Sequence, residues 1–272
     1  MDSIQNISQP PLQSLVIDLD RNGFCYLIYG KGDYQQPSIG RIAIKETGGS
    51  WLSVLENTIY DNSFLLEHYQ RVVIALHSQH FVIMPKELAE RRMAEQVFNA
   101  SFSAVDGELF TCQAGVDDAM IACDVPNGLV SFLKRTFSSP TILHHLSPLC
   151  RYCTKAYADE PESLHINVQK NEAHVVAARN ASLQMANTFS YRTMSDLVYY
   201  VLSVWKHCGM NTVTGKIFIT GDNDLRKELS QQLRQWVKYA MPEVMPAQAL
   251  RLGQNAVDIP FNLILLALYE DT

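Results

Sequence analysis

The chain has 272 residues, of which 47% are hydrophobic and 18% are charged, and its formal net charge at pH 7 is −6. This balance excludes a disordered chain and is typical of a globular protein with a sizeable core. The acidic charge and the lack of a long basic run exclude a typical nucleic-acid-binding surface. The longest apolar run near the end, residues 259–268, is too short to cross a membrane, which takes roughly 20 residues.

The first residues, MDSIQNISQPPLQ, have neither a basic start nor an apolar stretch, so we expect no signal peptide. Most of the six cysteines stand in apolar or helical contexts, which is typical of small core residues. Without an export signal, we expect reduced thiols and a cytoplasmic location.

The first half of the chain opens with a predicted hairpin. Two apolar runs flank Arg21-Asn22-Gly23, a sequence that favours a tight turn. A third strand follows, then a helix that we expect Ser50 to cap, then a fully apolar run typical of a buried parallel strand. The predicted elements are strands at residues 15–19, 24–29, 39–44 and 71–76 and a helix after Ser50.

An extra segment follows the fourth strand before the first half ends. Its pattern predicts a further strand, a helix that begins at Pro85, and a strand pair around a turn at Gly115. A helix, a strand and a helix close the half. The predicted ranges are strands at 80–84, 109–112, 119–123 and 141–146 and helices at 85–97, 126–137 and 148–157.

The second half opens as the first does. LVIDLDRNGFCYLIYG (residues 15–30) and LHINVQKNEAHVVAAR (residues 164–179) are both an apolar run, a polar turn and a second apolar run. An acidic, Pro-containing linker precedes the second copy. We therefore predict a duplicated α/β protein with one subdomain and its insert at residues 1–158 and a second subdomain at residues 159–272.

The rest of the second half predicts alternating helices and strands. Thr193 and Asp196 form a capping-box pattern, and Gly209 is a good helix stop. Trp51, Trp205 and Trp236 fall in predicted helices, so we expect them to pack in the core. The predicted ranges are strands at 164–168, 173–178, 182–188 and 216–220 and helices at 193–209, 224–239 and 260–269, with one more strand expected within 241–253.

The chain resembles the actin-like ATPase superfamily, whose fold pairs two ribonuclease-H-like subdomains with mixed five-stranded sheets. The segments IALHSQHFVIMPKEL and ELFTCQAGVDDAMIACDVPNGLVSFLKRTF carry the resemblance. They are similar to the bacterial branch that contains the cytoplasmic actin-like proteins of type IV pilus assembly and type II secretion. The best fit is a bacterial domain-of-unknown-function family with this fold. The resemblance covers most of the chain and contains no diagnostic catalytic motif.

In active members of the superfamily, the first hairpin resembles apolar-Asp-x-Gly, in which the Asp organises hydrated Mg²⁺ and the Gly admits phosphate oxygens. Asp18 matches the Asp, and Asp20 stands where the Gly is expected. At roughly 4 Å, two like charges repel by about 1 kcal/mol even in water. A carboxylate at this position therefore disfavours phosphate. Asn22 and Gly23 complete the turn, and an ordinary hairpin is the stronger interpretation of all four residues.

The second hairpin departs further from the family pattern. Asn167 replaces the Asp and Gln169 replaces the Gly. Asn cannot serve as a general base or lend negative charge to Mg²⁺. The third motif keeps one of two adjacent glycines, Gly221, followed by Asp222 at a helix start that favours anions weakly. If a nucleotide binds, the resemblance places it against Asp18, Asp20, Asn22, Gly23, Asn167, Gln169, Gly221 and Asp222.

Three degraded motifs predict a scaffold or protein-interaction module without catalytic residues, a pseudo-ATPase that needs no cofactor. In the analogous pilus and secretion proteins such a domain docks a partner's peptide, so the resemblance implies a protein partner or self-association. The alternative is a divergent ATP-binding protein or ATPase that uses Mg-ATP in the cleft between the subdomains.

Two enzyme-like patterns rank lower. His144-His145 with Cys150 and Cys153 suggests zinc, but the spacing matches no standard structural site, and we predict no metal. Ser78 between His77 and His80 suggests a nucleophile and base, but no Gly-x-Ser-x-Gly elbow is present.

Overall fold

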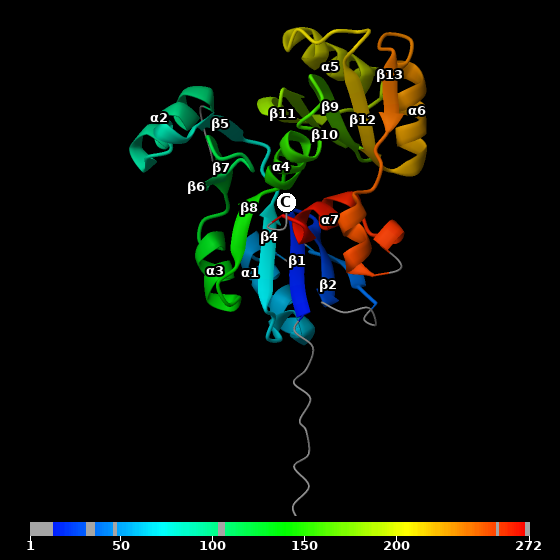
Figure 1. Ribbon diagram of the computed structural model, residues 1–272. Helices are drawn as coiled ribbons and strands as arrows, with labels where there is room; N and C mark the ends of the chain where they lie inside the picture. The colour runs from blue at the N-terminus through cyan, green and yellow to red at the C-terminus, as the bar shows by residue number, and fades with distance from the viewer. Residues whose placement is uncertain (1–12, 31–35, 46–47, 103–106, 254–255, 270–272) are drawn as a thin grey trace, which may run out of the picture.

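The computed structural model describes residues 13–30, 36–45, 48–102, 107–253 and 256–269. In this part of the chain, two five-stranded sheets and one three-stranded sheet are joined by seven α-helices (Figure 1). The start of the chain, where we expect no signal peptide, falls within residues 1–12, outside the described residues. No helix of the described part has the length and apolar character needed to cross a membrane.

The first sheet has the order β3-β2-β1-β4-β8. The hairpin of β1 (Gln13–Asp20) and β2 (Gly23–Gly30) is antiparallel, and β3 (Ser38–Ala43) extends it on one side. On the other side, β4 (Arg71–Leu76) and β8 (Thr141–His144) run parallel to β1. β1 and β4 lie in the middle, where both faces are buried, which explains their continuous apolar runs.

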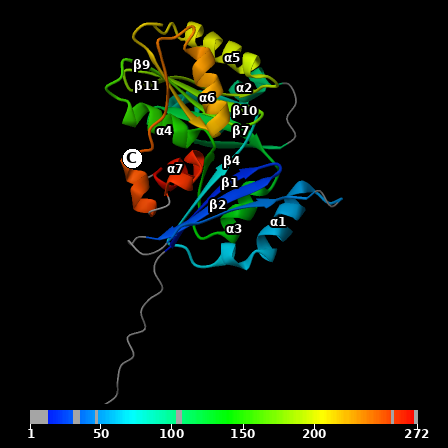
Figure 2. The same ribbon diagram turned by 90° about the vertical axis from the view of Figure 1, so that its right-hand side faces the viewer.

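Helices cover both faces of this sheet. Figure 2 shows α1 (Trp51–Asp61) and α3 (Leu129–Thr136) on one face and α7 (Phe261–Ala267) on the other. The side chain of Ser50 caps α1 by accepting from the Ser53 amide at 3.2 Å, as predicted. α3 begins later than predicted because Gly128, in the left-handed conformation, occupies its N-cap.

The insert predicted after the fourth strand forms its own small sheet with the order β5-β7-β6. β5 (Phe81–Pro85), β6 (Glu108–Gln113) and β7 (Ala119–Val125) are antiparallel, and α2 (Arg91–Ser101) packs on them. The helix predicted from Pro85 begins later, because Pro85 still pairs with Ala119 in the sheet.

The second sheet, β11-β10-β9-β12-β13, repeats the arrangement of the first. An antiparallel meander joins two parallel strands, and helices connect the later strands. The elements are β9 (Glu162–Val168), β10 (Glu172–Arg179), β11 (Ser182–Ser190), α5 (Met194–His207), β12 (Lys216–Gly221), α6 (Asn223–Leu233) and β13 (Tyr239–Pro242). The capping box predicted at Thr193 and Asp196 is present.

One helix prediction in the second half was wrong. We expected a helix at 224–239, but α6 ends at Leu233, and Tyr239 begins the edge strand β13. Trp236 lies in the connection between α6 and β13 and is 62% exposed. The prediction that it packs in the core was therefore wrong. α6 ends early because the residues that follow it pair with β12 as strand β13. No local sequence pattern indicates this pairing.

Two helices lie between the large sheets. α4 (Ser147–Ala156) follows β8 and contacts α7, β10 and β11. After β13 the chain returns to the first sheet, where Leu252 of the 3-10 helix Ala247–Leu252 and Leu263 and Leu266 of α7 share a core with β1 and β4. The division into subdomains at residues 158/159 stays a prediction. The end of the predicted second subdomain, including α7, packs on the sheet of the first.

Candidate functional site

The two polar turns that open the halves line one cleft of about 700 Å³. Asp20 and Asn22 contribute from the first turn, and Gln169 and Lys170 contribute from the second. Residues of both turns therefore line a single space. Its volume lies in the range of about 300–1,000 Å³ that is typical of small-molecule sites.

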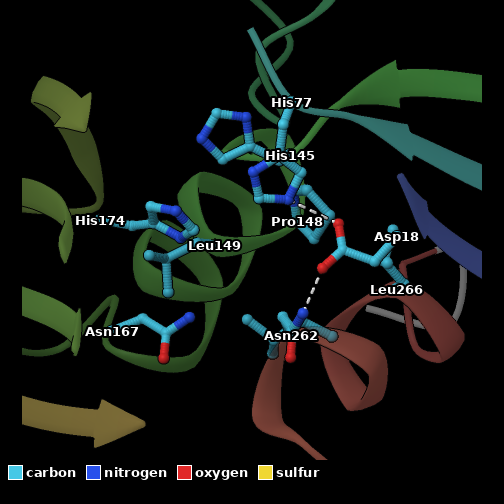
Figure 3. Close-up of a pocket in the computed structure, with 10 residues that line it drawn as sticks. Asp18, His77, His145, Pro148, Leu149, Asn167, His174, Asn262 and Leu266 are labelled. Atoms are coloured by element: carbon cyan, nitrogen blue, oxygen red, sulfur yellow. Dashed lines mark hydrogen bonds and ion pairs between the residues drawn. The ribbon is translucent and has the colours of Figure 1, made fainter. Parts of the chain in front are cut away.

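A much smaller cavity of about 10 Å³, which we call the cleft floor, adjoins the large cleft, and His77 and His145 line both spaces. Figure 3 shows its polar lining, with Asp18 from β1 and His174 from β10 beside the two histidines and Asn262 from α7 bonded to Asp18. A cavity of this size has room for about one water-sized particle.

Asp18 is held from two sides. Its Oδ1 lies 2.8 Å from His77 Nε2, and its Oδ2 accepts a hydrogen bond from the Asn262 amide. Burial raises the pKa of Asp18, but the charge and hydrogen bond of His77, with smaller contributions from His174 and Asn262, hold it below its usual value. The same pairing outweighs burial and raises the pKa of His77. Asp18 is therefore a paired carboxylate.

Three imidazoles gather beside Asp18. One ring nitrogen of each of His77, His145 and His174 lies within 4.8 Å of the other two. The rings of His77 and His145 are stacked, with centroids 4.2 Å apart, and the ring of His174 lies 4.7 Å from that of His145. Burial, with the charge of His77, holds the pKa of His145 well below its usual value, so His145 is neutral near pH 7.

Side-chain oxygens orient these rings. Glu172 Oε1 lies 2.9 Å from His174 Nε2 and 3.9 Å from His77 Nδ1. Thr188 Oγ1 lies 3.0 Å from His145 Nε2. The second-half strands β10 and β11 thus hold groups that contact histidines of the first half.

The predicted residues of the first hairpin separate into different environments. Asp18 lines the small cavity, while Asp20 and Asn22 line the large cleft. The Asp20 side chain accepts a hydrogen bond from the backbone N–H of Asn22 at 2.5 Å and pairs with Arg41 at 3.3 Å. Gly23 lines neither space, and a Cβ there would lie 2.2 Å from the Ile42 carbonyl oxygen. Close approach to β3 therefore explains this glycine.

The second-half residues divide in the same way. Asn167 lines the small cavity and Gln169 the large cleft, whereas Gly221 and Asp222 line neither. Gly221 has φ +101°, and a Cβ would meet the Val168 carbonyl oxygen at 1.9 Å. The Asp222 side chain accepts from two amides at the start of α6, so it occupies the helix N-terminus itself.

The structure does not bring together the residues of the two lower-ranked patterns, the zinc pattern and the serine nucleophile pattern. Burial raises the pKa of Cys150 to about 12 and holds that of Cys153 well above its usual value, and both thiols pack in an apolar cluster. The histidines that group with His145 in the described residues are His77 and His174. In the part of the chain that the structure describes, Cys150 and Cys153 therefore do not group with these histidines.

The nucleophile pattern is replaced by a different contact. Ser78 Oγ donates to Asp124 Oδ1 at 2.5 Å, and Asp124 Oδ2 lies 3.3 Å from His80 Nδ1. His77 faces Asp18 instead. The Ser78 hydroxyl is bonded to a carboxylate and lacks the imidazole base that activates a serine.

Sequence reasoning missed His174 and Asn262, and it placed His77 and His145 in other patterns. The weak signal for His174 is a polar residue within the apolar middle of a strand, EAHVVAAR, whose charged residues stand only at its two ends. Asn262 interrupts the apolar closing helix in the same way. Buried polar residues need partners, so each predicts a contact without naming it.

A family profile for a protein of unknown function, DUF3822, matches residues 2–239. The chain belongs to this family. A Bacteroides thetaiotaomicron VPI-5482 protein with an actin-like ATPase fold and unknown function is similar in structure to this DUF3822 chain: the TM-score is 0.74 at 19% identity, over 96% of this chain and 99% of that chain. A chain of the PilM–PilN type IV pilus biogenesis complex gives a TM-score of 0.61 at 13% identity, over 96% and 98%.

Comparison with curated proteins finds no match. The structural similarities confirm the expected actin-like ATPase fold with mixed five-stranded sheets, and at these identities they show the fold alone.

Proposed function

We propose that this DUF3822 chain is a cytoplasmic, non-catalytic scaffold that acts through protein contacts and does not hydrolyse ATP. One observation carries the proposal: both carboxylate oxygens of Asp18 are bonded to protein groups, His77 and Asn262. A carboxylate engaged in this way is withdrawn from the task of organising hydrated Mg²⁺.

The other residues around the cleft fit Mg-ATP poorly as well. Asp20 brings a carboxylate to the turn where phosphate would approach, and Asn167 and Gln169 bring uncharged amides to the opposite side. Mg²⁺ prefers oxygen ligands and keeps most of its waters, but three imidazoles line the small cavity beside Asp18. We derive no catalytic step through a nucleotide at this site.

Exposed apolar side chains support a role in protein contacts. Trp236 is 62% exposed and Val213 is 59% exposed. The two segments adjoin, since the Lys238 amide donates to the Thr212 carbonyl at 3.0 Å. Exposed apolar groups that lie together often mark interaction sites. The similar PilM chain assembles with PilN, so a protein partner or self-association is the corresponding proposal here.

The alternative is a divergent ATP-binding protein or ATPase. The cleft favours it in one respect, because Arg21, Arg41 and Lys170 line a space large enough for a nucleotide. Such a protein would use the cationic side chains in place of the lost phosphate loops.

Thermal unfolding with and without Mg-ATP, alongside phosphate release, separates the two. A ligand at 100 times its Kd stabilises a fold by about 2.7 kcal/mol, which is about 5–10 °C in Tm for a chain of this size. We expect no shift and no release. A clear shift that Asp18→Ala abolishes would establish the alternative. For the scaffold itself, sedimentation and pull-down experiments that return a partnerless monomer would count against the proposal.

A further inference from the structure

The three histidines at the cleft floor come from both halves of the molecule. His77 directly follows β4, His145 directly follows β8, and His174 lies in β10 of the second sheet. We propose that His77, His145 and His174 bind a divalent transition-metal ion of the zinc class, which joins the two subdomains. This inference goes beyond the scaffold proposal, since a non-catalytic protein can hold such an ion as a clamp.

The ligand type selects the ion. Imidazole nitrogen suits Zn²⁺, Cu²⁺, Ni²⁺ and Fe²⁺, while Mg²⁺ and Ca²⁺ require mostly oxygen. Three protein ligands with an open fourth position are a frequent zinc arrangement. Here the fourth position is available to water, because His77 and His145 also line the large cleft, which supplies an entry path.

Each imidazole already has the outer contact that metal-binding histidines use. In such sites the ring nitrogen opposite the metal bonds an oxygen, which orients the ring. The Nε2 atoms of His77, His174 and His145 lie 2.8, 2.9 and 3.0 Å from oxygens of Asp18, Glu172 and Thr188. The remaining nitrogen of His145, Nδ1, is buried and has no hydrogen-bond partner. A buried polar atom without a partner is costly, and an ion would satisfy it.

Binding requires a small closure. Zn–N bonds of about 2.0–2.1 Å in a tetrahedral site place ligand nitrogens about 3.3 Å apart. Here one nitrogen of each ring lies within 4.8 Å of one nitrogen of the other two, and His145 is stacked on His77. Coordination therefore turns the His145 ring and draws β10 toward the ends of β4 and β8. The cavity of about 10 Å³ between them has room for one ion.

The test uses the 272-residue chain after EDTA treatment and dialysis. Titration calorimetry with Zn²⁺ should give one ion per chain, and Zn²⁺ should raise Tm while Mg²⁺ should not. His174→Gln removes the only proposed ligand from the second half, and it should weaken Zn²⁺ binding at least tenfold. His68→Gln is the matched control, since His68 is exposed and outside the cluster. Equal binding by wild type and His174→Gln would overturn the proposal, as would absence of stoichiometric binding.

A spectroscopic measurement on the wild type keeps the proposal testable if His174→Gln does not fold. Co²⁺ in a tetrahedral site of nitrogen and oxygen ligands gives visible d–d bands, and thiolate ligands add a near-ultraviolet charge-transfer band. We expect the visible d–d bands without the near-ultraviolet thiolate band. A thiolate band would place the ion on cysteines and overturn the assignment, and an octahedral spectrum would overturn the proposed tetrahedral site with one open position.

Discussion

The hydrogen bond between Asn262 and Asp18 gives a direct measure of how the closing helix holds the cleft floor. The Asn262 amide donates to Asp18 Oδ2, and the Asp18 side chain is 10% exposed. A hydrogen bond to a charged group contributes about 1.5–3 kcal/mol. We expect Asn262→Ala to lower the free energy of unfolding by that amount, measured by urea unfolding in EDTA.

Asn262→Asp tests the same contact more severely. It replaces a donor with a second carboxylate, and two such charges about 4 Å apart interact by about 4 kcal/mol at an effective dielectric constant of 20. We therefore expect Asn262→Asp to destabilise the fold by several kcal/mol more than Asn262→Ala.

Exchanging the two side chains completes the cycle. The double variant Asp18→Asn with Asn262→Asp restores one donor and one carboxylate, so it should recover part of the loss caused by Asn262→Asp alone. Recovery is partial because His77 loses the charge of Asp18. Asn57→Asp, on the exposed face of α1, is the control and should change stability by less than about 0.5 kcal/mol. If the double variant recovers nothing, or Asn262→Ala costs as little as the control, the proposed tie between α7 and β1 is refuted.

Two further predictions concern the second half. Thr193→Ala removes the side chain that caps α5, so it should cost about 1 kcal/mol in urea unfolding, and an effect within error would contradict the cap. His165 is buried against Glu243 and the hydroxyl-bearing residues Ser163 and Tyr157, and burial, partly offset by Glu243, lowers its pKa. Below a pH of about 6.5, His165 becomes protonated in the unfolded chain but stays neutral in the folded chain. The free energy of unfolding should therefore decrease as the pH is lowered through this range. The difference in this free energy between wild type and His165→Gln should become smaller at the same time. A constant difference between them from pH 8 to 5 would contradict the assignment.

Much of the fold could be predicted because its signals are local. Apolar runs around a polar turn determine both hairpins, and the capping box at Thr193 needs residues of one helix turn. The end of α6 could not be predicted, because the strand at Tyr239 exists through pairing with β12. The composition of the small cavity is also non-local: Asp18, His174 and Asn262 lie on three elements that are far apart in the chain.

The first hairpin and the closing helix α7 meet at Asp18. α7 returns from the second half to pack on β1 and β4, and this packing brings Asn262 to Asp18. The carboxylate that the superfamily pattern assigns to Mg²⁺ becomes part of a tie between the hairpin, β4 and the chain's last helix. Imidazoles then occupy the floor of the cleft, where ligand preference turns from hard oxygen-binding ions toward zinc-like ions. If the proposed ion binds, the three histidines supply a further contact between the two halves of the chain.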